Sequence, residues 1–308
     1  MSISVVIPVY NSEQILPELV KMLDEVLKSM TNQFELILVN DDSHDHSWDV
    51  IMNLCASFPW VRGINLMRNY GQHNAVLCGI QHAQGEVIIT MDDDLQHPPE
   101  ALPLLVQKLS QGYDVVYGTP RREQQNHWRN LASRLTKITL QNTMGAETAS
   151  KVGPLRAIRA QVCQAFKHFQ SPDVNIDTLL TWGTTRFAAV MVDYAPRRVG
   201  KSNYTLKKLI VHAINMATGF STLPLRITSI LGFFFTLFGV GVLVYVVGRY
   251  LISGGSPAGF PFLASTIAIF SGAQLFALGI IGEYLARMYH RSMERPSSII
   301  RDKIGFTE

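Results

Sequence analysis

Short apolar runs alternate with helix-like patterns over the first two-thirds of the chain. Five runs rich in β-branched residues and bounded by turn residues predict strands at Ser4–Val9, Phe34–Asn40, Val61–Asn65, Val87–Met91 and Val115–Tyr117. Between them, apolar residues recur every three or four positions, which predicts helices after Ser12 as a candidate N-cap and over Gly71–Ala83 and Pro99–Gln111. Strands and helices joined by short connections indicate an α/β fold with a mostly parallel sheet covered on both faces.

The last third of the chain follows a different pattern. From Ile227 to Gly282 the only formally charged residue is Arg249. Ile227–Leu251 is about 38 Å long as a helix, enough to cross a hydrocarbon core of about 30 Å, and a second apolar run covers about 260–281 after a short turn. Two such runs favour a transmembrane hairpin over a buried hairpin in a soluble core. Gly232, Gly239 and Gly272 offer small surfaces for helix packing, so a homo-oligomer is a further expectation.

These patterns divide the chain into four expected parts. Residues 1–203 form the soluble α/β domain, 204–226 an amphipathic juxtamembrane segment, 227–285 the hairpin with spans at about 227–251 and 260–281, and 286–308 a C-terminal tail. Basic residues precede and follow the hairpin, so the positive-inside rule places both ends in the cytoplasm with the soluble domain.

The distribution of charge argues against one class of partner, and the spacing of the cysteines argues against two kinds of structural site. Residues 197–308 hold 12 Lys and Arg against 4 Asp and Glu, whereas residues 1–196 hold 15 against 20. The basic excess lies in the membrane part and not on the folded domain, which argues against a nucleic-acid partner. Three widely spaced cysteines suggest neither a disulfide framework nor a zinc site.

Polar residues follow each predicted strand of the soluble domain. In a parallel sheet of this kind, ligands bind beyond the carboxyl ends of the strands. The run Asp92–Asp94 follows an apolar strand, and in an extended segment Asp92 and Asp94 point to the same side. Mg²⁺ takes one or two carboxylates together with phosphate oxygens, so these two acids predict a site for a metal and a diphosphate. The competing interpretation is a solvated acidic turn before the helix that begins near Pro99.

The order and spacing of six motifs resemble the glycosyltransferase family 2 enzymes that act on polyprenyl phosphates, such as those that transfer aminoarabinose, glucose or mannose. The motifs are Ile3–Asn11, Asn40–Ser43, Arg68–His73, Asp92–Glu100, Arg197–Tyr204 and Gly282–Arg287. The resemblance covers nearly the whole chain. It implies a Rossmann-like GT-A fold, amphipathic interface helices and a two-helix hairpin.

The resemblance also implies roles for individual residues. Asp92 and Asp94 would hold Mg²⁺ or Mn²⁺, Asp41 would contact the base, and Gln96 would lie beside the sugar with Asp94 as its catalytic neighbour. The nucleotide-binding set is Pro8, Tyr10, Asn11, Asp41, Arg68, Gln72, Asp92 and Asp93. The basic segment before the membrane would bind the diphosphate or the lipid phosphate through Arg197, Arg198, Lys201 and Ser202.

Two positions depart from the family pattern. Asp42 stands where a glycine is usual, and Asp tolerates left-handed backbone geometry better than most residues. Several relatives carry a Gly-Asp pair, whose Asp is a proposed base, where Ala149–Gly153 contains no acid. Asp177 and Asp173 are the nearest candidates for a base, although Asp173 is equally suited to cap a helix. A phosphate monoester has a second pKa near 6 and is already a nucleophile at neutral pH, so a base is optional.

The sequence therefore predicts a metal-dependent, inverting transferase in the cytoplasmic membrane, with its catalytic domain facing the cytoplasm. It would move a sugar from a nucleotide sugar, most simply a UDP-sugar, to undecaprenyl phosphate for envelope glycan or lipopolysaccharide modification. Two alternatives stay open: a hydroxyl acceptor in place of the lipid phosphate, and a catalytically weakened, lipid-binding scaffold. The sequence does not distinguish among sugars.

Overall fold

The computed structural model describes residues 1–121, 151–171, 174–194, 223–253, 259–293 and 295–306. The chain divides into two compact units. The first comprises Met1–Leu209 with Glu294–Glu308, and the second comprises Ile210–Met293.

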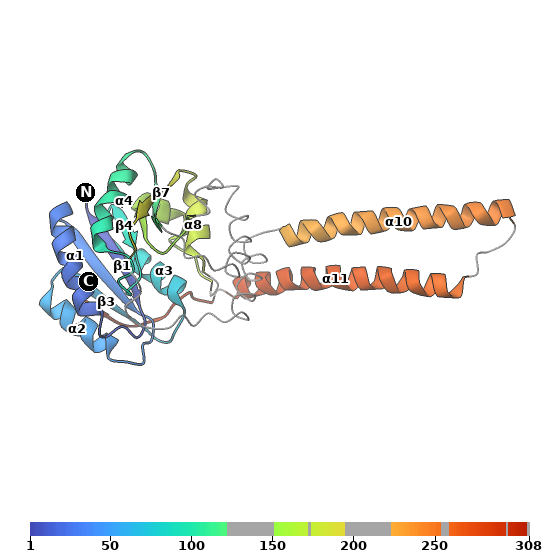
Figure 1. Ribbon diagram of the computed structural model, residues 1–308. Helices are drawn as coiled ribbons and strands as arrows, with labels where there is room; N and C mark the ends of the chain where they lie inside the picture. Colours follow the sequence, from blue (N-terminus) through green and yellow to red (C-terminus); the bar gives the residue numbers. More distant parts are fainter. Residues whose placement is uncertain (122–150, 172–173, 195–222, 254–258, 294, 307–308) are drawn as a thin grey trace. The chain divides into compact units, whose positions relative to one another are not determined.

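The first unit is built on an eight-stranded, mostly parallel mixed sheet (Figure 1). Its strand order is β7-β5-β6-β4-β1-β2-β3-β8, with β6 and β8 antiparallel to their neighbours. The strands are β1 (Ile3–Val9), β2 (Phe34–Asn40), β3 (Val61–Leu66), β4 (Val87–Thr90), β5 (Val115–Pro120), β6 (Arg156–Arg159), β7 (Phe187–Val192) and β8 (Ile300–Ile304). The Rossmann-like fold class predicted from the sequence is confirmed.

Helices cover both faces of this sheet. They are α1 (Leu16–Met30), α2 (Ser47–Ser57), α3 (Gln72–His82), the short helices η1 (Pro99–Ala101) and η2 (Gln164–Phe166), α4 (Leu102–Ser110), α7 (Ala160–Cys163) and α8 (Ile176–Gly183). Apolar residues of α1, α2 and α4 share one core cluster with one face of the sheet. Residues of α3, α7 and α8 share the second cluster with the other face.

Burial on both faces explains why the central strands are continuously apolar. Along β1, Val5 and Ile7 belong to the cluster beneath α1, whereas Val6 belongs to the cluster beneath α3. All three side chains are fully buried. The pleat thus sends alternate residues into separate cores, and the strand is held in register from both sides.

Some local features differ from the sequence-based expectations. Ser12 does not cap α1, which begins at Leu16 after Ile15. Pro17 is compatible with the first turn of a helix because its missing N–H needs no partner there, and the Ser12 hydroxyl donates to Asp93 instead.

A strand also appears in the region expected to be a C-terminal tail. After the apolar helices, the chain returns to the first unit, where β8 pairs antiparallel with β3 at the sheet edge. The backbone N–H of Met67 donates to the carbonyl of Ile299, and Arg301 donates to the carbonyl of Met67. The last strand therefore holds the segment that immediately follows β3.

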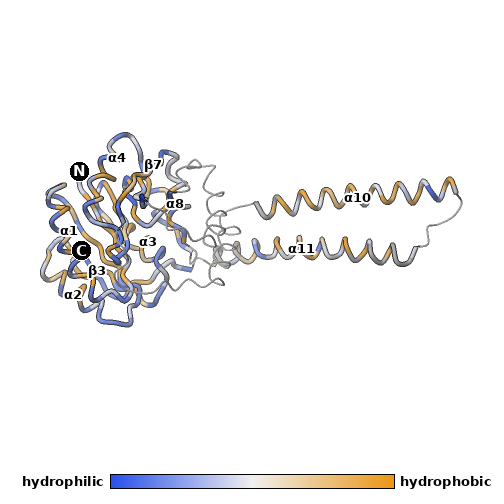
Figure 2. Tube along the Cα trace, viewed as in Figure 1, coloured by the Kyte–Doolittle hydropathy of each residue, from blue (hydrophilic) through white to orange (hydrophobic). Residues whose placement is uncertain are grey.

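The second unit contains α10 (Leu223–Ser253) and α11 (Phe260–Ser292). Figure 2 shows hydrophobic residues recurring along α10. Ile227–Ile252 and Ile269–Ala286 are long and apolar enough to cross a membrane, and neither span is buried within the protein. The helices meet where the Phe270 ring packs against Phe235, with 6.0 Å between the ring centroids. They form a candidate transmembrane hairpin.

Close packing of α3 on the sheet generates a stability prediction. A Cβ added at Gly79 would overlap Val6 and would lie 3.1 Å from Cγ2 of Val39. Alanine gains about 1 kcal/mol of helix propensity over glycine, but overpacking a core costs about 1–3 kcal/mol. We expect Gly79→Ala to lower the melting temperature and Gly79→Val to lower it further, measured by calorimetry on the full chain. An unchanged melting temperature in both variants would contradict this packing.

Candidate active site

The carboxyl ends of four parallel strands, β4, β1, β2 and β3, meet at one edge of the sheet. The chain proceeds from β1 to β2 and β3 on one side and then crosses to β4 on the other side of β1. The strand order thus reverses between β1 and β4, which is where open α/β sheets bind their ligands. Tyr10 follows β1 and Asp92 follows β4, so the two residues flank this point.

A cavity of about 320 Å³ opens at this edge. It is lined by Pro8, Val9, Tyr10, Asp41, Asn69, Gly71, Gln72, Asp92, Asp93 and Asp94. Seven of these ten residues belong to the site set expected from the sequence. Asn11, Arg68 and Gln96 also belong to that set but do not line this cavity. Val9, Asn69 and Gly71 are additions, and in the sequence they lie within the motifs Ile3–Asn11 and Arg68–His73.

The three consecutive acids after β4 face different environments. The carboxylate of Asp93 accepts hydrogen bonds from the Ser12 hydroxyl at 2.5 Å and from the Tyr10 backbone N–H at 3.3 Å. Burial raises the pKa of Asp93, and these two hydrogen bonds oppose the rise. Asp93 therefore ties the loop after β4 to the loop after β1.

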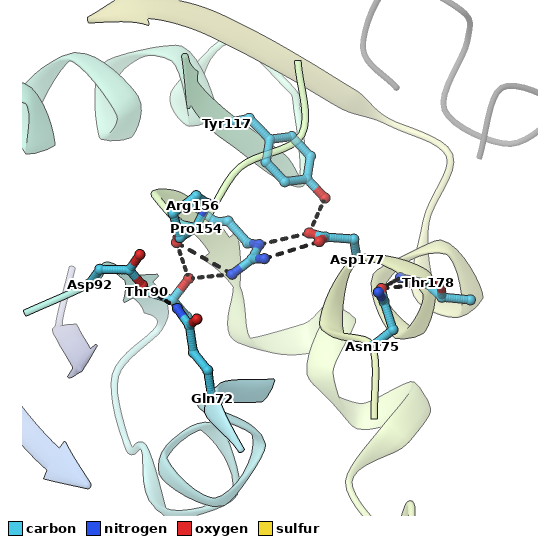
Figure 3. Close-up of polar contacts among 9 residues, drawn as sticks. All are labelled: Gln72, Thr90, Asp92, Tyr117, Pro154, Arg156, Asn175, Asp177 and Thr178. Atoms are coloured by element: carbon cyan, nitrogen blue, oxygen red, sulfur yellow. Dashed lines mark hydrogen bonds and ion pairs between the residues drawn. The ribbon is translucent and has the colours of Figure 1, made fainter. Parts of the chain in front are cut away.

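Asp92 and Asp94 have other partners at the cavity. The Gln72 side-chain amide, in the first turn of α3, donates to a carboxylate oxygen of Asp92 (Figure 3). The Gln96 backbone N–H donates to Asp94 at 3.1 Å, and Leu95 between them has φ of 57°. The backbone of this turn holds the carboxylate of Asp94, and Gln96 therefore lies next to that carboxylate.

Asp41 organises the loop that leads into α3. Its carboxylate accepts the backbone N–H groups of Tyr70 and Gly71, at 2.7 and 2.8 Å. Burial raises the pKa of Asp41, whereas the two N–H donors oppose the rise. Gly71 has φ of 90°, a left-handed conformation that favours glycine. The guanidinium of Arg68 lies over the Tyr70 ring at 4.6 Å from its centroid.

A row of amide side chains links the same edge of the sheet across three strands. The Asn40 side chain donates to Asn65 at 2.9 Å, and Asn65 donates to Asp302 of β8 at 3.2 Å. In the other direction the Ser43 hydroxyl donates to Asn40 and accepts the backbone N–H of Asn11. The row thus connects the C-terminal strand to the loop after β1.

The turn after β2 has the left-handed backbone geometry expected at a position where the family usually carries glycine. Asp42 has φ of 58°, and Asn11 has φ of 56°. Asn and Asp adopt this left-handed conformation more readily than other non-glycine residues. The expectation that Asp42 preserves the turn is confirmed.

A second cavity of about 220 Å³ adjoins the first through Gln72 and Asp92. Its lining comprises Gln72, His73, Val76, Thr90, Met91, Asp92, Val152, Gly153, Pro154, Arg156 and Asp177. Asp177, a candidate base in the sequence, lies here as a buried residue, but Arg156 contacts both of its oxygens at 2.8 and 3.1 Å. The Tyr117 hydroxyl donates to the same carboxylate at 3.1 Å. Arg156 and Tyr117 thus engage the carboxylate of Asp177, which is the ion-pair partner of Arg156 in this structure.

The donor set at the first cavity fits a divalent cation that shares its ligands with a substrate. Among the described residues, no group of three or more His, Cys, Asp or Glu side chains is placed to hold an ion by itself. Asp92 and Asp94 supply hard oxygen ligands, and Mg²⁺ is usually held by one or two carboxylates together with phosphate oxygens and waters. The two acids are therefore suited to an ion that arrives with a diphosphate.

His97 follows the acidic run in the sequence and is not one of the expected site residues. His97 is buried against Tyr194, with 4.6 Å between the ring centroids, and burial lowers the pKa of its imidazole to about 4. It is thus a neutral packing residue at neutral pH.

Asp173 and the basic set of Arg197, Arg198, Lys201 and Ser202 lie outside the described residues.

The different roles within the acidic run generate a prediction. Asp93→Ala removes the acceptor of the Ser12 hydroxyl and of the Tyr10 N–H, and an unsatisfied polar group costs about 1–3 kcal/mol. We expect a loss of this size in the free energy of unfolding, measured by chemical denaturation. Asp92→Asn retains an oxygen that accepts from Gln72, so it should change the free energy of unfolding little. Equal losses in the two variants would contradict the assignment.

Comparisons with known proteins agree with this geometry. The model of the family described as Glycosyl transferase family 2 matches residues 4–167. The chain is 37% identical to the undecaprenyl-phosphate 4-deoxy-4-formamido-L-arabinose transferase of Pseudomonas syringae pv. syringae (strain B728a), over 97% of this chain and 89% of the relative. It is 38% identical to the enzyme of the same name from Edwardsiella ictaluri (strain 93-146), over 98% of this chain and 94% of the relative.

A solved structure shares the fold. Glucosyl-3-phosphoglycerate synthase from Mycobacterium tuberculosis, in complex with Mn²⁺, UDP-glucose and phosphoglyceric acid, is 17% identical and has a TM-score of 0.52 over 70% of this chain and 77% of that one. At this identity the likeness concerns the fold alone. The match of the family model over more than half of the chain and the full-length relatives together show that this protein belongs to glycosyltransferase family 2.

Proposed function

We propose that this protein transfers a sugar from a UDP-sugar to undecaprenyl phosphate with inversion at the anomeric carbon. The observation that carries the proposal is the placement of Asp92 and Asp94 in one cavity with Tyr10 and Asp41, at the carboxyl edge of a family 2 sheet. The names of the full-length relatives support the acceptor and point to 4-deoxy-4-formamido-L-arabinose as the first sugar to test.

The two adjoining cavities suit the two halves of a nucleotide sugar. The larger one has Tyr10, Asp41 and Asn69 at its lining for a nucleoside, and the smaller one lies beyond Asp92. A diphosphate that spans Asp92 and Asp94 would place the sugar in the smaller cavity. The anomeric carbon would then lie beside the acids and Gln96.

A divalent cation, Mg²⁺ or Mn²⁺, would be held by Asp92 and Asp94. It would supply positive charge that offsets the charge on the departing diphosphate. The chain's own contribution is to fix these two carboxylates. Gln72 holds Asp92 from the start of α3, and the turn at Leu95 holds Asp94.

The reaction needs little proton chemistry. A phosphate oxygen of the lipid attacks the anomeric carbon, the bond from that carbon to the diphosphate oxygen breaks, and UDP leaves with the electron pair. The attacking phosphate is mostly a dianion at neutral pH because its second pKa is near 6. The engagement of Asp177 by Arg156 is compatible with this chemistry, since no free carboxylate base is required. Positioning and electrostatic stabilisation then supply the rate enhancement.

The acceptor would reach the site at a membrane surface. We propose that α10 and α11 cross the cytoplasmic membrane as a hairpin and that the α/β domain faces the cytoplasm. Basic residues on both sides of the hairpin support this orientation. Arg197, Arg198, Lys201 and Ser202 would bind the lipid phosphate or the diphosphate from the segment before α10. The product would be a lipid-linked sugar for modification of an envelope glycan or lipopolysaccharide.

Removal of one metal ligand tests the reaction. We expect Asp94→Asn to lower turnover by at least about 100-fold, the loss typical when charge stabilisation of a transition state is removed. The assay incubates membranes that contain the protein with radiolabelled UDP-sugars, including UDP-4-deoxy-4-formamido-L-arabinose, and measures label extracted with polyprenyl phosphate. Chelation of divalent cations should abolish the wild-type signal. Label on a hydroxyl acceptor but not on polyprenyl phosphate would contradict the proposed acceptor, and full activity without divalent cations would contradict the metal site.

Substitution in the basic segment tests the acceptor site separately. We expect Arg197→Ala with Lys201→Ala to raise the KM for polyprenyl phosphate about tenfold or more, because hydrogen bonds to charged groups contribute about 1.5–3 kcal/mol. Lys207→Ala with Lys208→Ala is the matched control, since it removes the same charge from the neighbouring segment. Equal effects of the two double variants would indicate general attraction to an anionic membrane and would count against a phosphate site.

A further inference from the structure

Arg156 is a buried cation that lies outside the six family motifs. It is the first residue of β6, directly opposite Thr90 at the end of β4, and is only 4% exposed. Two residues after Thr90 the chain reaches Asp92. Arg156 lines the smaller cavity together with Asp92.

The hydrogen bonds of Arg156 account for most of its donors (Figure 3). Nε donates to Oδ1 of Asp177 at 2.8 Å and Nη2 donates to Oδ2 at 3.1 Å. Nη1 donates to the Thr90 hydroxyl at 3.1 Å and to the Pro154 carbonyl at 3.3 Å. A guanidinium group has five N–H bonds, so these contacts use four of them. Counted over contacts with the described residues, one N–H of Nη2 is left over.

The pairing partner of Arg156 is itself fixed. Asp177 lies in the first turn of α8, whose N-cap Asn175 accepts the backbone N–H of Thr178 at 2.9 Å. The hydroxyl of Tyr117, a fully buried residue of β5, also donates to Asp177. The guanidinium is thus anchored from three elements and cannot turn without breaking several buried hydrogen bonds.

The cavity above this pair has the size and charge for an uncharged sugar. At about 30 Å³ for each water molecule in the liquid, a volume of about 220 Å³ holds about seven waters, which is room for one pyranose ring. Asp177 neutralises Arg156, and Asp92 lies at the rim, so the smaller cavity has no excess of positive charge to select a phosphate. A fixed N–H donor in such a cavity matches a hydroxyl or carbonyl oxygen.

We infer that Arg156 donates its remaining Nη2 hydrogen to an oxygen of the donor sugar and thereby determines which sugar the enzyme accepts. This inference rests on the proposed function, because it takes the smaller cavity as the place of the donor sugar. Asp177, Thr90 and Tyr117 are positioning residues for the guanidinium. A site built to donate a hydrogen bond rejects analogues that lack the acceptor, since its buried donor is then unpaired.

The experiment compares the binding of UDP and of UDP-4-deoxy-4-formamido-L-arabinose by calorimetry on the full-length protein with Mn²⁺. Arg156→Lys keeps the charge but cannot reproduce the fork of donors. We expect its affinity for UDP to stay within about twofold of wild type and its affinity for the UDP-sugar to fall about 10- to 100-fold, the range for a hydrogen bond from a charged group. In turnover, the KM for the UDP-sugar should rise more than kcat falls.

Arg159→Lys is the matched control from the same strand. Arg159 donates to the carbonyls of Tyr113 and Leu109 and does not line the smaller cavity. It should leave both affinities unchanged.

A second variant guards against a folding defect in Arg156→Lys. Replacing a buried ion pair with apolar residues of similar size is often neutral for stability, whereas removing one partner leaves an unpaired charge. The combination of Arg156→Met, Asp177→Leu and Tyr117→Phe removes the pair together with the hydroxyl that would lose its acceptor. It should retain UDP binding and lose the same sugar-dependent affinity.

The possible results distinguish a failure of the role proposed for Arg156 from a failure of the proposed function. Equal changes in the affinities for UDP and the UDP-sugar, or no change in either, would overturn the role of Arg156 and leave the proposed function intact. Wild-type protein that binds neither ligand would overturn the proposed function itself.

Discussion

The different contacts made by three consecutive acids, Asp92, Asp93 and Asp94, determine how the rest of this site is arranged. All three acids line the cavity, where Asp93 ties the loops after β4 and β1 together, while Gln72 holds Asp92 and the backbone of Gln96 holds Asp94. Two carboxylates at one cavity repel each other unless a cation lies between them or one binds a proton. A divalent ion that carries a diphosphate satisfies this arrangement. The loops and helix starts around the cavity, from Gln72 to the turn at Leu95, hold these two carboxylates in place.

The surrounding sheet supplies rigidity through buried hydrogen bonds. The amide row from Asn40 through Asn65 reaches Asp302, so the strand that follows the apolar helices is connected to the carboxyl edge of the sheet. On the other side of the site, the pair of Arg156 and Asp177 fixes the smaller cavity. The two cavities, proposed for the nucleotide and the sugar, have Gln72 and Asp92 in common.

The central strands and most residues that line the acidic cavity could be predicted from the sequence because of the way a parallel sheet is buried. Strands buried on both faces are continuously apolar, and the polar residues that follow them must lie at one edge of a parallel sheet. Strand β8 carries Arg301, Asp302 and Lys303 within five residues, because an edge strand needs charge and not apolar surface. No hydrophobic pattern therefore marked it, and β6, with an arginine at each end, was missed in the same way. The partnership of Asp177 with Arg156 joins residues 21 positions apart and depends on packing that no local pattern encodes.

We propose that Asp92 and Asp94 bind a divalent cation together with the diphosphate of the donor. The most direct measurement is the affinity of the full-length protein for UDP by calorimetry, with Mn²⁺ and after its removal by a chelator. We expect binding at least about tenfold tighter with Mn²⁺ in the wild-type protein and no such gain in Asp94→Asn. An affinity for UDP that is the same with and without Mn²⁺ would contradict it.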